Sequence, residues 1–387
     1  MEDAILVFNA GSSSIKFALF SIPDLNLLYR GKIGNIFDKP RLTAFSKQHR
    51  QIVNELLSFS GYEFSLTHLF DWLWSLPNRF TLKAVGHRVV HGGTFFDGPC
   101  LITEKIIEQI ESLIPLAPLH QPLNVEAIKS IVKLYPTLPQ VACFDTTFHQ
   151  TQEHLATLFA IPRALSSEGI IRYGFHGISY EYIASVLPKN AGSKVIVAHL
   201  GNGASLCAMK NGKSVATSMG FTALDGLMMG TRCGAIDPGV LLYLLQEKHY
   251  APDELSDLLY HKSGLLGVSE LSSNIQELQF SLEPYAIEAI DLFCYRAAQE
   301  LCALLAPLQG CDSIIFTAGI GENSAVVRNK LCKHLEWLGL ILDEDANLND
   351  ASVISASTSS ILVGVIPTNE EYMLACHTQR IFLESPK

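Results

Sequence analysis

Short apolar runs that end in glycine-containing turns recur along the chain. Three such segments are residues 4–20 (AILVFNAGSSSIKFALF), 194–209 (KVIVAHLGNGASLCAM) and 313–327 (SIIFTAGIGENSAVV). After the first two turns the apolar residues recur at about every second position, which is typical of a strand. Each of these two turns is therefore predicted to join two strands of a hairpin. The pattern excludes a P-loop and a Rossmann nucleotide site, because both need a helix to begin there.

The first two of these segments continue in the same way. A second turn follows, at Pro23 in one and at Asn211 in the other, and a third short strand comes next. We interpret residues 4–32 and 194–218 as an internal duplication. Each copy is predicted to be a β-meander that opens an α/β domain.

Helices are predicted where apolar residues recur at a spacing near 3.6. These segments are 103–113, 125–134, 252–260 and 282–308. The last is long and apolar on more than one face, so we expect it to be buried at a domain or subunit interface.

Length and composition narrow the class of protein. A chain of 387 residues with 48% hydrophobic residues predicts two domains packed around a cleft, and the scarcity of Gly-Pro-rich joints favours a hinge over a flexible linker. A net charge of -10 disfavours binding to nucleic acid or to anionic membranes. No stretch of 18 uncharged apolar residues occurs, so we expect no membrane span.

The cysteines and the N-terminus favour a cytoplasmic protein. The nine cysteines are scattered and never spaced as CxxC, so we expect reduced thiols and not a disulfide framework or a zinc site. The chain enters a strand within four residues of Met1, so we expect no signal peptide. The cysteines are Cys100, Cys143, Cys207, Cys233, Cys294, Cys302, Cys311, Cys332 and Cys376.

The first glycine turn carries candidate phosphate ligands. Backbone N–H groups in such a turn can point at phosphate, and small polar side chains add donors without bulk. Asn9 precedes the turn, and alternation after it places Ser12, Ser14 and Lys16 on one side of the strand. The alternative interpretation is an ordinary hairpin with polar residues facing solvent.

Two arginines lie on glycine-flanked segments, and their fixed charge suits a carboxylate or a phosphate held in bidentate fashion. Arg88 ends the apolar strand in AVGHRVVHGG, and Arg232 lies in MMGTRCGAIDP. His87 and His91 flank Arg88 without a third ligand at metal spacing, so we interpret them as histidines of the core or of the wall of the site. Two such arginines suit an anionic substrate whose charge must be held during reaction.

Further polar residues interrupt apolar stretches. Asp145 follows the predicted strand 140–144 and is a candidate to orient a metal or a substrate, with helix capping as the alternative. His176 lies between Phe175 and a glycine, where an imidazole could meet developing charge, although a core histidine would fit as well. Glu370 or its neighbour Glu371 could hold Mg²⁺ through water or could instead be a carboxylate at a helix N-terminus.

Taken in order, these motifs closely resemble the acetate kinase family of the acetate and sugar kinase, Hsp70 and actin superfamily. The resemblance runs nearly from end to end, and many matches in one order are far more specific than any single glycine turn. The matching motifs are NAGSSSIKF, VGHRVVHGG, PLHQP, FDTTFHQ, RYGFHG, HLGNGAS, SMGFT, GTRCG, KSGLLGVS, FTAGIGEN and PTNEE.

The resemblance implies a role for each matching position. Arg88 and Arg232 would hold the substrate carboxylate and the phosphoryl oxygens, His176 would stabilise the transition state, and Asp145 would organise the substrate. Metal ligands would be Asn9 and Glu370. The acyl pocket would be Val90, Leu119, Phe175 and Ala223. Nucleotide and phosphate contacts would be Ser12, Ser14, Lys16, His199, Asn202, Gly203, Asn274, Ile275, Gln276, Gly319, Ile320 and Asn323.

The family also implies a fold and a reaction. The fold would be α/β, a duplicated actin-like ATPase of ribonuclease H-like domains: residues 1–148, to which 372–387 return, and the nucleotide-binding domain 149–371. The reaction would be reversible, in-line phosphoryl transfer from ATP to acetate, giving acetyl phosphate and ADP. It would need Mg²⁺, with Mn²⁺ as an alternative, and the usual assembly would be a homodimer.

The chain departs from the family pattern at several positions. Ala223 replaces the proline of GFTP, which could enlarge the acyl pocket towards propionate. Ile178 and Tyr180 stand where a threonine and a second histidine are usual. Asn274 and Gln276 stand where the family commonly has an aspartate and an arginine, so the nucleotide preference is open.

Two other interpretations remain at this point. A propionate or butyrate kinase would share the motifs and differ in the acyl pocket. An actin-like or Hsp70-like ATPase module that drives binding to a protein partner would share the fold but would leave Arg88 and Arg232 without a purpose.

Overall fold

The computed structural model describes residues 2–11, 14–76 and 80–384. The chain divides into two compact units. Unit 1 consists of Met1–Thr147 together with Asn369–Lys387, and unit 2 is the continuous segment Phe148–Thr368. Both units are α/β, and each is described below by itself.

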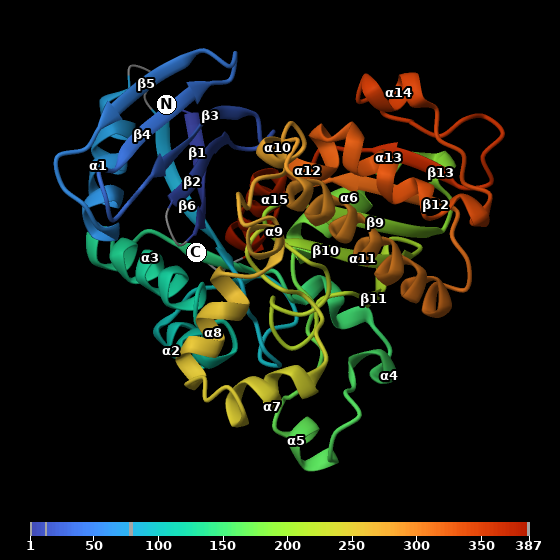
Figure 1. The fold of residues 1–387 in the computed structure, drawn as a ribbon. Helices are drawn as coiled ribbons and strands as arrows, with labels where there is room; N and C mark the ends of the chain where they lie inside the picture. The colour runs from blue at the N-terminus through green and yellow to red at the C-terminus, as the bar shows by residue number, and fades with distance from the viewer. Residues whose placement is uncertain (1, 12–13, 77–79, 385–387) are drawn as a thin grey trace. The chain divides into compact units, whose positions relative to one another are not determined.

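Unit 1 is built on a mixed sheet, for which the described residues give eight strands in the order β5-β4-β3-β2-β1-β6-β8-β7 (Figure 1). The first three strands pair antiparallel in sequence, which confirms the first predicted meander. β1, β6 and β8 are parallel neighbours, so their carboxyl ends meet at one edge of the sheet. The strands are β1 (Glu2–Ala10), β2 (Ser14–Ser21), β3 (Leu27–Gly34), β4 (Arg41–Ser46), β5 (Gln51–Leu56), β6 (Phe80–Val89), β7 (Cys100–Leu101) and β8 (Gln140–Phe144).

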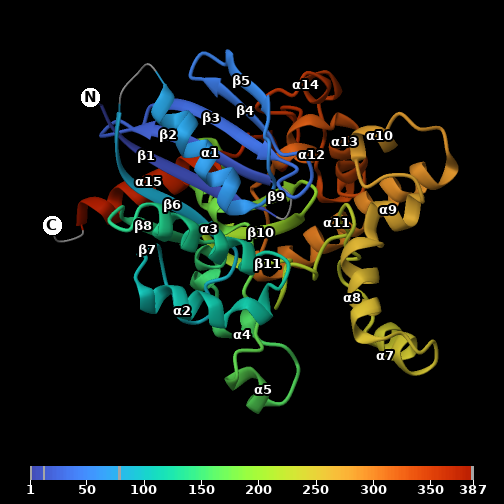
Figure 2. The same ribbon diagram turned by 90° about the vertical axis from the view of Figure 1, so that its left-hand side faces the viewer.

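Helices pack on this sheet from distant parts of the chain. α3 contacts β1 and β6, and α15 contacts β1, β6 and β8, so the last segment of the chain is part of the unit that the first segment begins (Figure 2). The close approach of Gly86 in β6 to Thr378 in α15 leaves no room for a Cβ at residue 86. The helices are α1 (Tyr62–Ser75), α2 (Glu104–Ser112), η1 (Ile114–Leu116), α3 (Gln121–Leu134) and α15 (Glu370–Glu384).

Unit 2 repeats the same opening. Its described residues form a five-stranded sheet in the order β11-β10-β9-β12-β13, in which β9, β10 and β11 pair antiparallel and confirm the second predicted meander. β9, β12 and β13 are parallel. The strands are β9 (Lys194–Leu200), β10 (Ala204–Lys210), β11 (Lys213–Thr217), β12 (Ser313–Thr317) and β13 (Leu362–Val365).

The third glycine-containing turn, after β12, leads into a helix and not into a strand. The helices of this part of the chain are η2 (Thr147–Thr151), α4 (His154–Thr157), α5 (Arg163–Ser167), α6 (Gly177–Val186), η3 (Lys189–Ala191), α7 (Pro238–Gln246), α8 (Pro252–His261), α9 (Gly264–Ser269), α10 (Ile275–Leu278), α11 (Pro284–Leu308), α12 (Ala318–Asn323), α13 (Ala325–Lys333), η4 (Glu336–Leu338) and α14 (Glu344–Leu348).

The predicted helices are confirmed, with small differences at their ends. Thr103 is the N-cap of α2, with its side chain accepting from the N–H of Ile106, so the helix begins one residue later than predicted. α3 begins four residues earlier than predicted, at Gln121. No helix in the part of the chain that the structure describes is long and apolar enough to cross a bilayer.

The long helix α11 packs one of its faces on the core of unit 2, and its predicted place at a domain or subunit interface stays a prediction. It contacts α9, α13, β10 and β11, all of the same unit. Fully buried side chains such as Phe293 and Leu301 run along one side, whereas Tyr285, Ile287 and Tyr295 are exposed. Its apolar character on more than one face therefore comes from a core face plus scattered exposed aromatic and aliphatic residues, which are ordinary on protein surfaces.

Candidate active site

Arg88 is the centre of a charged cluster in unit 1. It lies next to the last residue of β6, and Asp145 directly follows the neighbouring parallel strand β8, so the topology brings both side chains to one edge. Arg88 Nε donates to both Asp145 oxygens at 3.0 Å, and Nη2 donates to Asp145 Oδ2 at 2.6 Å. Nη1 donates to Glu370 Oε2 at 3.1 Å. Asp145 is therefore held by Arg88, whereas sequence alone had left helix capping open.

This cluster fixes the charge and the direction of Arg88. The Arg88 and Asp145 side chains are 16% and 2% exposed, respectively. Burial opposes the charged form, but the carboxylates of Asp145 and Glu370 outweigh it and raise the pKa of Arg88 above its ordinary value. A guanidinium has five N–H donors. Within the described residues, the bonds to the two carboxylates use the Nε donor and one donor on each terminal nitrogen, which leaves two N–H groups for an anion.

Glu370 is the first residue of α15, so it is a carboxylate at a helix N-terminus, and it is also a member of the Arg88 cluster. Its role as a Mg²⁺ ligand stays a prediction. Its Oε2 also lies 3.5 Å from Asn9 Nδ2, at the carboxyl end of β1. Asn9 pairs directly with Lys16 across the β1–β2 hairpin, so the exposed Lys16 side chain shares its face. Ser14 is partly buried and pairs with Gly34. Ser12 lies outside the described residues.

Both histidines beside Arg88 are buried, as interpreted from the sequence. His87 Nε2 lies 2.7 Å from Gln140 Oε1, and burial lowers the pKa of His87 to about 4. His91 Nδ1 accepts from the N–H of Gly93. In unit 2 His149 is similar, with its Nε2 2.9 Å from the carbonyl of Phe175, and burial lowers its pKa to about 4. The imidazoles of His87 and His149 stay neutral at physiological pH.

The predicted acyl-pocket residues fall in both units. Val90 and Leu119 belong to unit 1 and are partly buried, and the backbone N–H of Val90 donates to Asn124 Oδ1 at 3.0 Å. Phe175 and Ala223 belong to unit 2, where Phe175 is 2% exposed.

Arg232 and His176 converge on the glycine turn between β9 and β10. A Cβ at Gly203 would lie 3.0 Å from Arg232 Nη2 and 3.4 Å from His176 Nε2. Arg232 Nη1 donates to the carbonyl of Ala223 at 2.6 Å, so Ala223 orients the guanidinium through its backbone. Within the described residues Arg232 has no ion pair, and burial lowers its pKa. A partly buried guanidinium without a carboxylate is suited to binding an anion.

His176 is held in a strained position. It is the N-cap of α6 and has left-handed backbone angles, with φ 59° and ψ 22°. A non-glycine residue there costs about 1 kcal/mol or more, and such strain clusters at functional sites. Its ring stacks on His199 at 4.2 Å between centroids with an interplanar angle of 16°. The two rings make parallel bonds through Nδ1, to Ser205 Oγ and to Ser179 Oγ, each 2.8 Å long.

A pocket of about 250 Å³ opens beside the same turn. Seven predicted nucleotide residues line it, whereas His199 and Gly203 are not in its lining. Asn274 Oδ1 accepts from the N–H of Gln276 as the N-cap of α10. The aspartate that is common in the family would serve equally as an N-cap, so the asparagine at position 274 keeps the start of α10 intact. The seven residues are Asn202, Asn274, Ile275, Gln276, Gly319, Ile320 and Asn323.

A buried arginine that sequence reasoning missed supports this pocket. Arg328 is 0% exposed, and its Nη1 donates to the carbonyls of Gly321 and Glu322, at the end of α12. Its other nitrogens donate to Asn347 and Asp350. Arginine is rarely fully buried, so its burial would have drawn attention to Arg328. The sequence around this position does not indicate that the side chain is buried.

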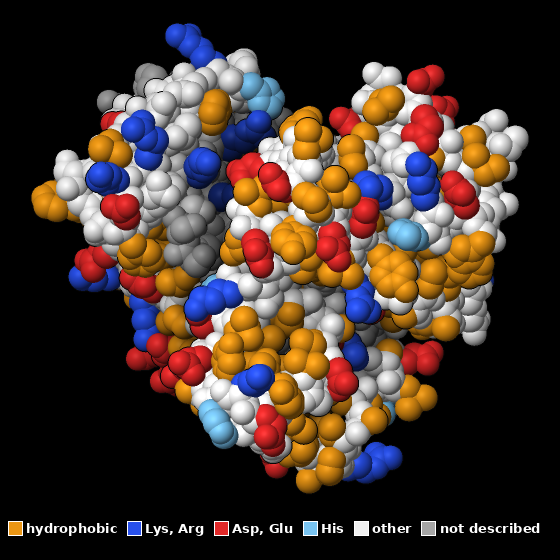
Figure 3. All heavy atoms as spheres, in the orientation of Figure 1, with side chains coloured by type: hydrophobic (Ala, Val, Ile, Leu, Met, Phe, Trp, Pro, Cys, Tyr) orange, Lys and Arg blue, Asp and Glu red, His pale blue; other side chains and the backbone are white. Residues whose placement is uncertain are grey.

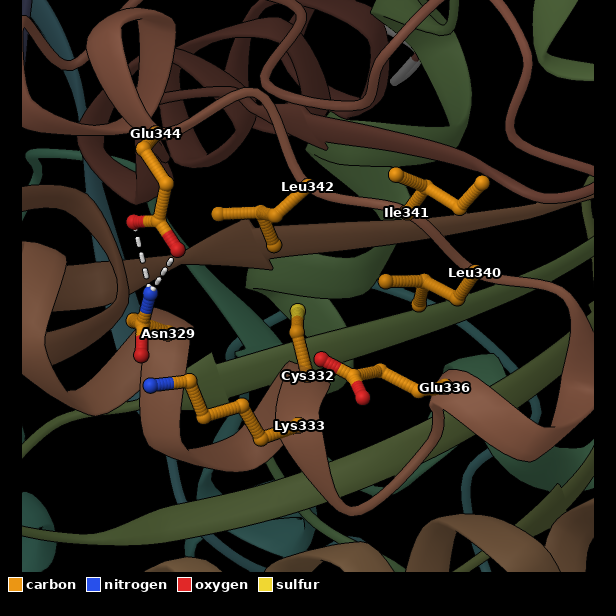
Figure 4. A pocket seen from close by; sticks show the side chains of 8 residues that line it. All are labelled: Asn329, Cys332, Lys333, Glu336, Leu340, Ile341, Leu342 and Glu344. Carbon is orange, nitrogen blue, oxygen red and sulfur yellow. Dashed lines mark hydrogen bonds between the residues drawn. The ribbon is translucent and has the colours of Figure 1, made fainter.

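A second pocket in unit 2, of about 240 Å³, contains none of the predicted site residues (Figure 4). Asn329 Nδ2 donates to both oxygens of Glu344 across it at 2.6 Å, and Leu340 and Leu342 form part of the wall. Asn329 and Glu344 are thus engaged with each other, and the described residues that line this pocket include no arginine.

Two α/β units that each open with a glycine-turn meander, with the Arg88 cluster in one and a pocket beside the glycine turn of the other, are features expected of a kinase. The acetokinase family model matches residues 4–376 of the chain. The chain belongs to the acetokinase family.

Individual relatives agree over nearly the whole length. An acetate kinase from Rhodopseudomonas palustris is 49% identical over 393 residues, covering 98% of this chain and 99% of that protein. The crystal structure of a propionate kinase from Francisella tularensis matches with a TM-score of 0.91 at 37% identity, covering 98% of this chain and all of the other. The structure of Porphyromonas gingivalis acetate kinase matches with a TM-score of 0.87 at 35% identity, covering 98% and 99%.

The buried histidines predict how stability depends on pH. The pKa values of His87 and His149 are lower in the folded chain, about 4, than the ordinary 6.5, so the unfolded chain binds more protons between these values. The contribution of each neutral histidine to the free energy of unfolding is therefore fully present above pH 6.5 and is lost as the pH falls towards 4. We expect each histidine to account for about 2 kcal/mol of loss between pH 7 and pH 5.

Urea unfolding at pH 7 and pH 5 measures this difference. His149→Gln should shrink it by about half, whereas His154→Gln, at an exposed position, should leave it unchanged. An equal pH dependence in both variants would contradict the assignment.

Proposed function

We propose that the protein catalyses reversible transfer of the γ-phosphoryl group of ATP to acetate, giving acetyl phosphate and ADP. The observation that carries the proposal is Arg88, fixed between two carboxylates with two N–H groups left for an anion, in a chain of the acetokinase family. An ATPase module would have no use for such a carboxylate-binding arginine.

The reaction requires the two substrates to be positioned and their negative charge to be neutralised. A carboxylate oxygen of acetate attacks the γ-phosphorus, the bond from phosphorus to the ADP oxygen breaks on the opposite side, and no proton needs to move. A general base is therefore unnecessary, since the carboxylate is already a competent nucleophile. Catalysis then depends on alignment and on donors directed at the equatorial oxygens.

In unit 1, Arg88 holds the acetate carboxylate through its remaining N–H groups, and Asp145 keeps the guanidinium in place. The candidates for contact with the acetate methyl group are Val90 and Leu119 in this unit and Phe175 and Ala223 in unit 2. The exposed Lys16, on the same face as Asn9, attracts phosphate with Ser12 and Ser14 of the first glycine turn.

Mg²⁺ fits the residues at the end of β1. Asn9 and Glu370 lie close together, with Asn9 Nδ2 3.5 Å from Glu370 Oε2, and each side chain carries an oxygen, the ligand type that Mg²⁺ prefers. Within the described residues no group of three or more His, Cys, Asp or Glu side chains could hold a metal ion, so the protein would supply few ligands and the polyphosphate and water would supply the rest. Mg²⁺, or Mn²⁺ in its place, would neutralise phosphate charge.

In unit 2, Arg232 and the Nε2 atom of His176 bind the transferred phosphoryl group over Gly203. His199, Asn202 and Gly203 contact the nucleotide phosphates, and the pocket beside the turn holds adenosine. The proposal requires both sets of residues, those of unit 1 and those of unit 2, to act on the same phosphoryl group.

Propionate is the second candidate acceptor. Ala223 has a smaller side chain than the proline usual in the family, and one of the structural relatives is a propionate kinase. The identity of 49% to an acetate kinase favours acetate. The nine cysteines are all free thiols, which favours the cytoplasm as the place of action.

Formation of acyl phosphate, trapped as the hydroxamate, tests the proposal directly. Purified protein with Mg²⁺ is assayed with acetate, propionate and butyrate against ATP, GTP and pyrophosphate. We expect product with acetate and ATP, and turnover of propionate relative to acetate ranks the two acceptors. Hydrolysis of ATP without acyl phosphate from any pair would instead support the ATPase module.

Arg88→Ala and Arg232→Ala should each lower kcat/KM by about two to three orders of magnitude, because each removes an electrostatic donor worth roughly 3 kcal/mol or more in the transition state. Arg296→Ala is the matched control, since Arg296 lies exposed on α11, where it donates a hydrogen bond to Gln299. The hydroxamate assay measures all three. Near-normal activity of both site variants would refute the roles assigned to these arginines.

We also propose a homodimer formed through α7. This helix is strongly apolar yet has no buried residue, and hydrophobic side chains gather over its region on the face shown in Figure 3. Val240, Leu242 and Tyr243 are 40%, 54% and 51% exposed. Exposed apolar patches of this kind mark interaction surfaces.

Light scattering after size exclusion should give twice the chain mass of 42.5 kDa. Leu242→Glu should shift the protein towards monomer, whereas Leu155→Glu, at a position 81% exposed, should not. A monomer in the unmodified protein would refute the assembly.

A further inference from the structure

Tyr180 is a buried phenol with one hydrogen-bond partner. It lies on α6 with an exposed fraction of 0% and is surrounded by the rings of Phe148, His149 and His199. Its hydroxyl lies 2.5 Å from Ser205 Oγ, the single contact that the described residues offer it. Burial raises the pKa of Tyr180 well above its ordinary value, so the phenol keeps its proton.

Ser205 connects this phenol to His176. It lies near the start of β10, has an exposed fraction of 0%, and pairs directly with His199 of β9. Its Oγ lies 2.8 Å from His176 Nδ1. Tyr180 follows His176 by four residues, one helical turn, so α6 places both side chains against the same strand.

Because these groups are buried, their hydrogen bonds decide which of Tyr180, Ser205 and His176 donates and which accepts. If Tyr180 donates to Ser205, the serine proton goes to His176 Nδ1, and all three groups are satisfied. If His176 instead donated from Nδ1 to Ser205, either the phenol proton or the serine proton would have no acceptor among the described residues. A buried donor without an acceptor is strongly disfavoured, so the first arrangement holds.

The first arrangement makes Nδ1 of His176 an acceptor and places its proton on Nε2. Nε2 is the atom that faces Gly203 beside Arg232. The ring therefore directs an N–H donor, and not a lone pair, towards the position assigned above to the transferred phosphoryl group.

We propose that Tyr180 and Ser205 are positioning residues that fix His176 in the Nε2–H tautomer for donation to the phosphoryl group in the transition state. The identity of the acceptor rests on the proposed function, whereas the tautomer does not.

The second stacked ring has a matching arrangement. Ser179 Oγ lies 2.8 Å from His199 Nδ1 and also 2.8 Å from Thr368 Oγ1. Two rings stacked at 4.2 Å disfavour a second positive charge, so holding both by hydroxyl groups at Nδ1 avoids that repulsion. The hydrogen bonds from Tyr180 to Ser205 and from Ser205 to His176 form a relay. A tyrosine suits position 180 because its phenol stays protonated near neutral pH and so remains the hydrogen-bond donor to Ser205, whereas an imidazole could change its protonation state.

The tautomer is measured first, in the unmodified protein without substrates. Nitrogen-15 spectra of protein labelled in its 13 histidines report which ring nitrogen carries the proton, and loss of one signal set in His176→Gln assigns the residue. We expect Nδ1 to be unprotonated and Nε2 protonated. A proton on Nδ1 would overturn the proposal whatever the enzyme's activity.

Kinetics then measure the consequence. Tyr180→Phe and Ser205→Ala should each mix the tautomers and lower kcat by about 10- to 100-fold, the usual cost of losing a partner that orients a ligand, with little change in the KM for ATP. Tyr173→Phe is the matched control, since it also removes one hydroxyl, bonded to the carbonyl of Gly169, in the same unit.

Each outcome has a defined meaning. If the two variants retain the unmodified kcat, as Tyr173→Phe should, the relay has no role in positioning. Circular dichroism checks the fold, and Ser205→Ala breaks the same link without changing an aromatic ring if Tyr180→Phe does not fold. Absence of acyl phosphate formation in the unmodified protein would refute the proposed function and leave the tautomer assignment standing.

Discussion

The ion pair of Arg88 with Asp145 and Glu370 is the constraint on which the candidate site of unit 1 depends. The three residues come from β6, from the residue after β8 and from the start of α15, so the pair forms only when the sheet is in register and the last helix has packed on it. Removal of either carboxylate would leave a largely buried guanidinium partly uncompensated, which is costly. The same pair leaves two N–H groups directed elsewhere, so structure and ligand binding share one side chain.

The two meanders show how one motif serves two kinds of chemistry. In unit 1 the hairpin pairs Asn9 with Lys16 on one face, which provides an amide and a cation. In unit 2 the corresponding hairpin pairs His199 with Ser205, and the turn itself lies under Arg232 and His176. In unit 1 the neighbouring parallel strands β6 and β8 add Arg88 and Asp145 at their carboxyl ends, where ligands of open α/β sheets usually bind.

Much of the fold was readable from sequence, because both meanders and all four helices follow directly from apolar spacing. The candidate residues also come together within each unit, as the Arg88 cluster and the nucleotide pocket show. What sequence could not give depends on burial and on atom-level contacts. The backbone carbonyl of Ala223, the phenol of Tyr180 and the buried Arg328 contribute through contacts that no spacing reveals.

Unit 1 is discontinuous, since it takes its first 147 residues from the beginning of the chain and its last helix from residues 369 onwards. During synthesis on the ribosome the sheet of this unit is made first, yet α15 emerges last. The continuous unit 2 can complete its fold before the chain is released, whereas the N-terminal unit must wait with β1 and β6 uncovered on the face that α15 will occupy. Completion of unit 1 therefore waits for a helix that is translated after the whole of unit 2.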